Sequence, residues 1–129
     1  MATDDISKEV KRFISDHIDS VEALEVLLLL RDYPNREWSA EEVSRELYTQ
    51  TESAAKRLAE LQSINLLAAT GGPSLLYRYS PDTGELDRTV SELSKAYKER
   101  RVTVIGLIFS SPSDKIRTFA DAFKIKRDK

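Results

Sequence analysis

The chain has 129 residues, no cysteine, and a formal charge of −2 from 20 basic and 22 acidic side chains. This length fits one domain with appended segments, and the absence of cysteine excludes disulfides and thiolate metal sites. The amino terminus lacks the basic and apolar regions of a signal peptide, and the longest apolar run, Val26–Leu30, is far too short to span a membrane. We therefore expect a cytoplasmic protein that makes no membrane contact.

The first predicted element is an amphipathic helix near the amino terminus. Its apolar residues recur at helical spacing and are Ile6, Val10, Phe13, Ile14 and Ile18. This face needs a partner, which is either the rest of the chain or a second subunit. The single histidine, His17, ends the helix without a second histidine or a cysteine beside it, so we expect no metal-binding or catalytic role for it.

A second helix is predicted directly after the first. Asp19-Ser20 can cap it, with Glu22 available to complete a capping box. From Val21 to Leu30 the helix is apolar almost all round, which predicts burial on several sides at the centre of the domain. Pro34 ends it, because the residue before a proline avoids the helical region.

The segment Arg36–Trp38 is predicted to be a small strand that pairs with a later hairpin. Trp38, the single tryptophan, has two interpretations. It is either an exposed contact for a base or a partner protein, or an aromatic side chain packed beneath the strand, and we favour packing.

Two short amphipathic helices are predicted next. Ser39 and Glu42 form a capping box, in which each side chain satisfies a backbone N–H at the start of a helix, so the first of the two begins near Ala40. Ala40, Val43 and Leu47 then share one buried face.

The second of these helices follows a polar turn at Tyr48–Thr51. Either Thr49, with Glu52 three residues on, or Thr51 can cap it. Its predicted inner stripe is Ala54, Ala55, Leu58 and Leu61. Its predicted outer face is Ser53, Lys56, Arg57 and Glu60.

A β-hairpin is predicted immediately after the second helix. Asn65 suits the left-handed conformation that ends many helices. Leu66–Thr70 and Leu75–Ser80 form two apolar strands around a loop of glycine, proline and serine at 71–74. Arg78 is the only charged residue of this hairpin. Two crossed helices followed by a hairpin are the layout of a winged helix.

Residues 20–80 resemble the winged helix-turn-helix DNA-binding domains of bacterial MarR-like transcriptional regulators. The resemblance is carried by SAEEVSREL, a turn, AAKRLAELQ, INLL in the place where such domains usually have a glycine before two leucines, and a wing that ends in YRYS. It implies that the second helix enters the major groove of DNA and that the wing contacts the backbone or the minor groove. The residues that it assigns to DNA binding are Thr51, Ser53, Lys56, Arg57 and, on the wing, Arg78.

The next predicted element is one long helix, from Gly84 to Phe109, roughly 39 Å in length. Its apolar seam is spaced by alternating steps of four and three residues, interrupted by Arg100. Because this helix is longer than a compact winged helix can cover, we expect part of it to meet a second chain. The predicted dimer interface is Leu86, Val90, Leu93, Tyr97, Val104 and Leu107.

Residues 101–109 have a second interpretation, as a strand. Their β-branched residues and Gly106 favour it. We prefer a helix, because the seam continues through the segment and no turn signal precedes it.

After a break at Ser110–Ser113, a last short helix is predicted. Its shared apolar face is Ile116, Phe119, Ala120 and Phe123. The basic tail at 124–129 either contacts phosphates or an acidic partner, or is a solvated terminus.

These elements predict a mainly α protein with a small β-hairpin wing. Three parts are expected: an amino-terminal helix at 1–19, a winged helix-turn-helix domain at 20–80, and a helical dimerisation extension at 81–129. The sequence contains no glycine-rich phosphate loop, no metal-spaced set of ligands and no nucleophile with a usable base, so we expect neither enzymatic activity nor a cofactor.

Two functional hypotheses remain at this point. The first is a homodimeric DNA-binding regulator in which the second helix of each subunit enters the major groove of one half-site. The second is a winged helix that binds a partner protein and no DNA, supported by the nearly neutral charge of the second helix. They differ in whether Lys56, Arg57 and Arg78 form one positive face, or whether Glu52 and Glu60 neutralise Lys56.

Overall fold

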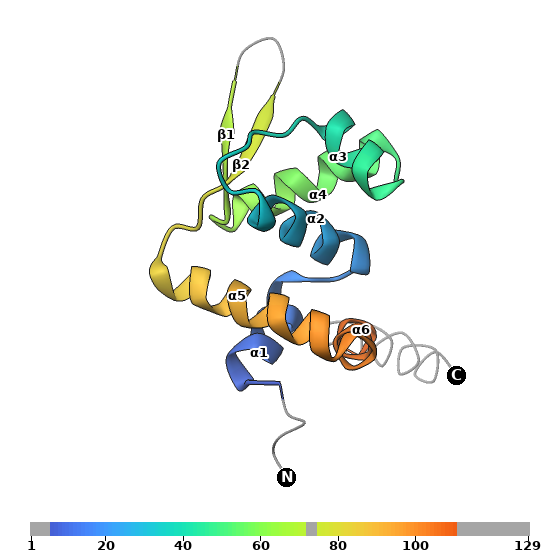
Figure 1. Cartoon of the computed structure of the whole chain (residues 1–129), viewed down its shortest axis with the longest axis vertical. Helices are drawn as coiled ribbons and strands as arrows, with labels where there is room; N and C mark the ends of the chain where they lie inside the picture. Colours follow the sequence, from blue (N-terminus) through green and yellow to red (C-terminus); the bar gives the residue numbers. More distant parts are fainter. Residues whose placement is uncertain (1–5, 72–74, 111–129) are drawn as a thin grey trace, which may run out of the picture.

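A computed structural model of the chain describes residues 6–71 and 75–110. These ranges contain six helices and one two-stranded antiparallel sheet, arranged as in Figure 1. In chain order they are α1 (Lys8–His17), α2 (Val21–Asp32), α3 (Ala40–Leu47), α4 (Thr51–Ser63), β1 (Leu67–Thr70), β2 (Leu76–Tyr79), α5 (Gly84–Glu99) and α6 (Arg101–Phe109). The predicted fold class, mainly α with a hairpin wing, is confirmed.

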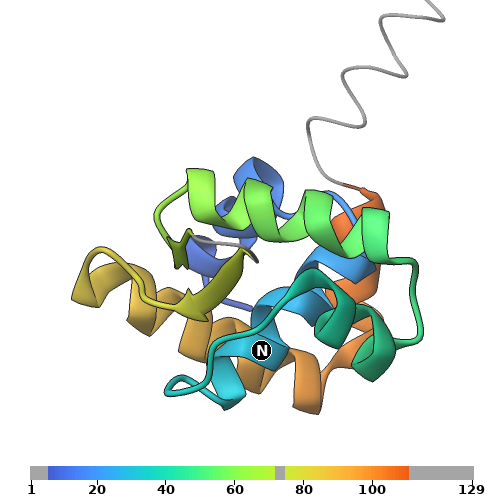
Figure 2. The same ribbon diagram turned by 90° about the horizontal axis from the view of Figure 1, so that it is seen from above.

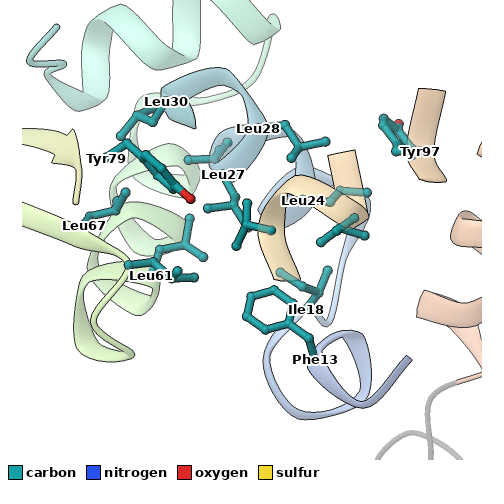
Figure 3. Packing of buried hydrophobic residues seen from close by; sticks show 14 of the residues in the cluster. Phe13, Ile18, Leu24, Leu27, Leu28, Leu30, Leu61, Leu67, Tyr79 and Tyr97 are labelled. Atoms are coloured by element: carbon teal, nitrogen blue, oxygen red, sulfur yellow. The ribbon is translucent and has the colours of Figure 1, made fainter. Parts of the chain in front are cut away.

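The helix α2 is the centre of the molecule. Figures 1 and 2 both show it between α4 on one side and α5 on the other. Leu24, Val26, Leu27 and Leu30 are each fully buried, as its nearly uniform apolar sequence predicts. Figure 3 shows these leucines meeting side chains from α1, α4 and the hairpin in one hydrophobic cluster.

The amphipathic helix α1 finds its partner within the same chain. All five apolar residues of the predicted face are buried, and α1 packs against α5 and α6. The hydroxyl of Ser7 caps it by accepting a hydrogen bond from the backbone N–H of Val10. One hydrophobic cluster therefore contains side chains from all three predicted parts of the chain.

The predicted starts of α3 and α2 are confirmed, but one detail at α2 is wrong. Ser39 and Glu42 form the predicted capping box at α3, and Ser20 caps α2 by accepting from the N–H of Ala23. Glu22 completes no box at α2. Its position is one residue short of the N3 position that a box at Ser20 requires, and its carboxylate binds elsewhere.

The helix α4 starts without either of its predicted caps. The N-cap residue is Gln50, and its side chain makes no capping hydrogen bond. The hydroxyl of Thr49 instead donates to Glu22, and that of Thr51 pairs with Ser44 at 3.1 Å. Both candidate threonines are drawn away from the helix end by partners that lie on other helices.

The hairpin forms as predicted, with one difference at its edge. Asn65 has a positive φ of 70°, and β1 and β2 pair in register from Leu67↔Tyr79 to Thr70↔Leu76. The predicted strand at Arg36–Trp38 is reduced to a single bridge, in which Trp38 and Tyr77 exchange backbone hydrogen bonds of 2.7 and 2.8 Å. The tip at 72–74 lies outside the described residues.

Trp38 is packed, as favoured, with only 1% of its surface exposed. The guanidinium of Arg36 lies 3.6 Å from the centroid of its ring, a cation–π contact that covers the outer side of the tryptophan.

The predicted single carboxy-terminal helix is wrong, because the chain breaks at Arg100. This residue has φ −138° and ψ 58°, so α5 ends there and α6 starts in a new direction. The bend brings Val104 and Ile108 into the core, where α6 packs against both α1 and α5. Residues 101–109 are helical, so the strand alternative is excluded, and the helix predicted after Ser113 lies outside the described residues.

We predict that Leu27→Ala lowers the free energy of unfolding by about 3 kcal/mol, because it leaves a cavity in the fully buried centre of α2. Urea unfolding followed by the fluorescence of Trp38 measures the change. Leu75→Ala, at a side chain that is 51% exposed, is the control and should cost under about 0.5 kcal/mol. Equal effects of the two substitutions would contradict the central position of α2.

Candidate nucleic-acid interface

The outward face of α4 is narrower than the sequence predicts. Ala54, Leu58 and Leu61 are buried against the rest of the domain. The residues that project on the opposite side, at helical spacing, are Glu52, Lys56, Ala59 and Ser63, and all four are exposed. This face carries one positive and one negative charge.

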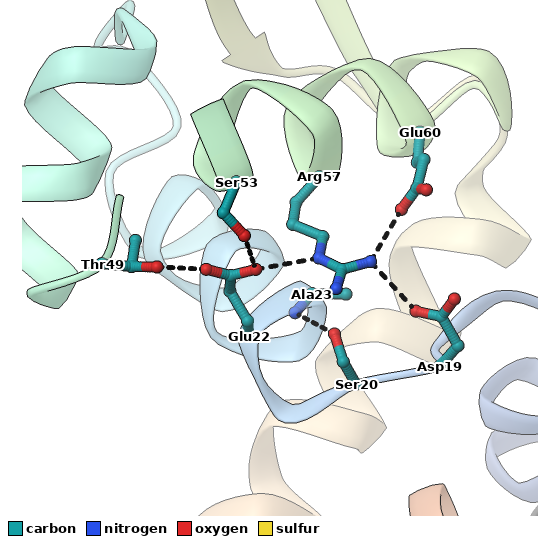
Figure 4. A network of polar contacts seen from close by, with 8 residues as sticks. All are labelled: Asp19, Ser20, Glu22, Ala23, Thr49, Ser53, Arg57 and Glu60. Atoms are coloured by element: carbon teal, nitrogen blue, oxygen red, sulfur yellow. Dashed lines mark hydrogen bonds and ion pairs between the residues drawn. The ribbon is translucent and has the colours of Figure 1, made fainter. Parts of the chain in front are cut away.

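Two residues of the predicted outer face, Ser53 and Arg57, turn inward instead. Figure 4 shows both of them, one helical turn apart on α4, bound to Glu22 at the start of α2. The hydroxyl of Ser53 donates to Glu22 Oε1 at 2.5 Å, and Arg57 Nε donates to the same oxygen at 3.0 Å. The second carboxylate oxygen accepts from the hydroxyl of Thr49 in the helix-turn-helix turn.

Arg57 is bound by three carboxylates of its own chain. Besides Glu22, its Nη1 contacts Asp19 Oδ1 and Glu60 Oε1, each at 3.3 Å. Only 16% of its side chain is exposed. A guanidinium with three carboxylate partners has little capacity left for a DNA phosphate, so the assignment of Arg57 to a groove contact does not match its position.

The environment of Glu22 keeps its carboxylate ionised. Burial alone would raise its pKa, but the hydrogen bonds donated by Ser53, Thr49 and Arg57 outweigh burial and hold the pKa below its ordinary value. Burial would lower the pKa of Arg57, but its hydrogen bonds to Glu22 and Glu60 and the negative charges of Asp19 and Glu60 outweigh burial and raise the pKa. The pair is therefore charged on both sides throughout the neutral pH range.

The remaining predicted DNA contacts are open to solvent. Thr51, Lys56 and Arg78 are exposed. Among the described residues, neither Lys56 nor Arg78 has an ion pair. Glu60 pairs with Arg57 and not with Lys56, which removes one of the two acidic groups expected to neutralise this lysine.

The wing is held against α5 by a buried tyrosine. Tyr79 donates its hydroxyl to Asp87 Oδ1 at 2.8 Å, and only 8% of the residue is exposed. Burial and the neighbouring carboxylate of Asp87 both raise the pKa of Tyr79 above its ordinary value, so the hydroxyl stays a donor. The side chains of β2 alternate, and this anchor leaves Arg78 on the free face of the hairpin.

The predicted dimer seam faces the protein's own core. Val90 and Leu93 on α5 are fully buried within one chain, and so is Val104 on α6. Tyr97 is buried with its hydroxyl on Glu25 at 3.1 Å. Leu86 and Leu107 are partly buried against the same cluster.

The described residues show no group of three metal-ligating side chains that could hold a metal ion.

A cavity of about 400 Å³ lies between α2, α5 and α6. At its rim, Glu25 accepts a hydrogen bond from the hydroxyl of Tyr97 and pairs with Arg101. Across residues 6–71 and 75–110, every helix is too short or too polar to cross a membrane.

The role of Glu22 was not predicted from the sequence. Its one available signal was an acidic residue at the start of an otherwise apolar helix, and this fits a helix cap equally well. Its actual partners come from two other elements, so they could be found only in the folded chain.

Comparison with solved structures supports this architecture. YusO from Bacillus subtilis is 15% identical, with a TM-score of 0.53 over 95% of this chain and 84% of that one. The chain has a winged-helix fold. No protein-family model matches the chain, and no curated protein sequence does.

Two further similar structures have a described relation to DNA. One is a homodimeric winged helix-turn-helix DNA-binding domain from Mycobacterium bovis, a possible ArsR-family transcriptional regulator. It is 19% identical, with a TM-score of 0.52 over 67% of this chain and 77% of that one. The other is a MepR mutant from S. aureus bound to an oligodeoxyribonucleotide, 14% identical, with a TM-score of 0.51 over 95% of this chain and 91% of that one. At these identities the likeness concerns the fold.

We predict that Glu22→Gln lowers the free energy of unfolding at pH 7 by roughly 2 kcal/mol, because it leaves the half-buried Arg57 without its main partner. The pKa of Glu22 is lowered in the folded state, so its contribution is complete above the ordinary carboxylate pKa and is lost as the pH falls through the lowered value. Urea unfolding at a series of pH values should therefore show a weaker loss of stability in acid for the variant.

The matched control is Glu46→Gln, at an exposed carboxylate on α3 that is outside this network. It should follow the parent protein at every pH. A Glu22→Gln variant with an unchanged pH dependence would show that the network does not contribute to stability.

Proposed function

We propose that the chain is a winged-helix DNA-binding transcriptional regulator that acts as a homodimer. The observation that carries the proposal is the exposed outer face of α4, with Lys56 free of ion pairs among the described residues, next to a wing that presents Arg78. An exposed helix of a helix-turn-helix is the element that lies in the major groove in such proteins.

The distribution of charge argues for a dimer. One lysine on α4 and one arginine on the wing neutralise few phosphates, so a single domain binds weakly. Two linked domains bind neighbouring half-sites together, and the second binding event is then intramolecular. Both similar structures described above as DNA-related fit this proposal, one as a homodimer and one as a DNA complex.

The proposed dimer contact lies on α6. Val102 is 84% exposed and Phe109 is 67% exposed. They lie seven residues apart, with Gly106 between them on the same side of the helix, where an added Cβ would meet no atom within 4 Å. An exposed apolar stripe of this kind fits a second copy of α6, and the small glycine allows close approach.

In this proposal the winged helix at 20–80 binds DNA, and the carboxy-terminal extension from 81 onward joins two subunits together with α1.

A regulator of bacterial genes acts in the cytoplasm, where the bacterial chromosome lies. Bacillus subtilis, Mycobacterium bovis and S. aureus, the sources of the similar structures, are consistent with a bacterial origin.

We predict that the protein binds mixed-sequence duplex DNA in a salt-dependent way, and that Lys56→Ala weakens this binding. Each phosphate contact that is lost should reduce the slope of log K against log salt by about 0.9, because fewer counterions are released. Fluorescence anisotropy of a labelled duplex at a series of salt concentrations measures both the affinity and the slope.

The control for Lys56→Ala is Lys11→Ala, which removes the same charge from an exposed position on α1, away from the helix-turn-helix. It should leave the slope unchanged. The absence of DNA binding by the parent protein at low salt and high protein concentration would overturn the proposal, and would direct attention to a protein partner.

We predict that Val102→Asp converts the protein to a monomer, because it places a charge in the apolar stripe of α6. Size-exclusion chromatography with light scattering measures the mass. Thr103→Asp puts the same charge on a different, exposed side of α6 and should stay dimeric. A parent protein that is monomeric at high concentration would contradict the dimer.

A further inference from the structure

The turn between α3 and α4 contains an exposed aromatic side chain in an unusual backbone conformation. Tyr48 ends α3 in the left-handed region, with φ 57° and ψ 47°. Its side chain is 95% exposed, the most exposed of the large apolar residues in the described chain.

This conformation is unfavourable for tyrosine. A side chain in the left-handed region brings its Cβ close to the following carbonyl oxygen, and glycine avoids this contact. The other non-glycine residue with positive φ among the described residues is Asn65, a type that tolerates the conformation well. Tyr48 therefore occupies a position that glycine or asparagine would fill with less strain.

The left-handed backbone of Tyr48 closes the end of α3, because the backbone N–H groups of Tyr48 and Thr49 both donate to the carbonyl of Ser44. The tyrosine side chain takes no part in this closure. In the described part of the structure, the hydroxyl of Tyr48 has no hydrogen-bond partner and its ring has no aromatic or cation–π contact. Packing cannot compensate either, since the side chain lies almost entirely in water. An exposed aromatic side chain without an internal contact, at a position that glycine would fill with less strain, is a candidate for contact with a partner.

The position of Tyr48 indicates which partner. The turn leads directly into α4, the helix that the proposed function places in the major groove, so residues of the turn lie beside the DNA backbone when α4 is docked. Tyrosine hydroxyls are among the groups that donate to phosphate oxygens in protein–DNA complexes. Resting on that proposed function, we infer that Tyr48 is a DNA-backbone contact, with its hydroxyl on a phosphate and its ring against the adjoining sugar.

The surroundings of Tyr48 favour DNA over a protein partner. The next residues, Thr49, Gln50 and Thr51, are polar, so the ring does not belong to a larger apolar patch of the kind that binds proteins. Arg45 and Glu46, both exposed at the end of α3, balance each other in charge. The contact therefore depends on the hydroxyl and the ring, and it releases no counterion of its own.

The test compares three variants with the parent protein on a labelled duplex of mixed sequence, about 30 bp long, which accommodates two half-sites. Tyr48→Phe removes the hydroxyl alone, and Tyr48→Gly removes the whole side chain and relieves the strain. Tyr33→Phe is the matched control, at a tyrosine that is 55% exposed in the loop before α3.

We expect Tyr48→Phe to weaken binding by about tenfold or more and Tyr48→Gly further still, as expected for the loss of a hydrogen bond to a charged group. The salt slope should stay at the parent value, in contrast to Lys56→Ala, because a neutral contact is lost. Tyr48→Gly should be at least as stable to heat as the parent, so weaker binding cannot result from unfolding. Tyr33→Phe should bind like the parent.

Binding by both Tyr48 variants at the parent affinity would overturn the inference while leaving the proposed function in place. So would an equal loss in Tyr33→Phe. A parent protein that binds no DNA at low salt would overturn the proposed function and this inference together.

Discussion

The carboxylate of Glu22 is the contact on which the position of α4 in the winged helix depends. It lies at the first turn of α2 and accepts hydrogen bonds from the turn before α4 and from two successive turns of α4 itself. Hydrophobic packing alone would allow α4 to slide or rotate slightly on α2, because apolar contacts are not directional. A carboxylate with three fixed donors removes that freedom, and so sets which residues of α4 face outward.

This arrangement explains why the exposed face of α4 carries so little charge. The helix has two basic residues, and Arg57 is better suited than Lys56 to bind phosphate through two hydrogen bonds. Arg57 instead stabilises the fold through its ion pair with Glu22. The protein thus exchanges electrostatic affinity for a rigidly positioned helix. Polar contacts that do not depend on net charge, such as those available to Thr51 and Tyr48, gain importance in such a design.

The helix α2 also connects the two ends of the molecule. On the side opposite α4, Arg31 donates to Ser91 at 3.1 Å, and Glu25 accepts from Tyr97 at 3.1 Å. Since α6 carries the proposed dimer contact and packs against α5, a rotation of one subunit against the other would act on α2 through these two helices. The position of each α4 relative to its partner is therefore tied to the dimer through a single central helix.

The amino-acid sequence by itself determined the features that depend on neighbours within one or two turns. The capping box of Ser39 and Glu42, the apolar face of α1 and the left-handed Asn65 were all predicted, because the groups involved are close in the chain. The winged-helix layout followed from the order of these local elements.

Only the tertiary structure decided which side chains remain free. The periodicity of α4 placed Ser53 and Arg57 on its outer face, but Glu22, more than thirty residues away in sequence, draws them inward. The heptad seam correctly predicted helices in α5 and α6, yet Arg100 bends the chain and turns Val90, Leu93 and Val104 to the protein's own core. Spacing shows which residues share a face of a helix, whereas the surface that this face meets depends on how distant elements pack.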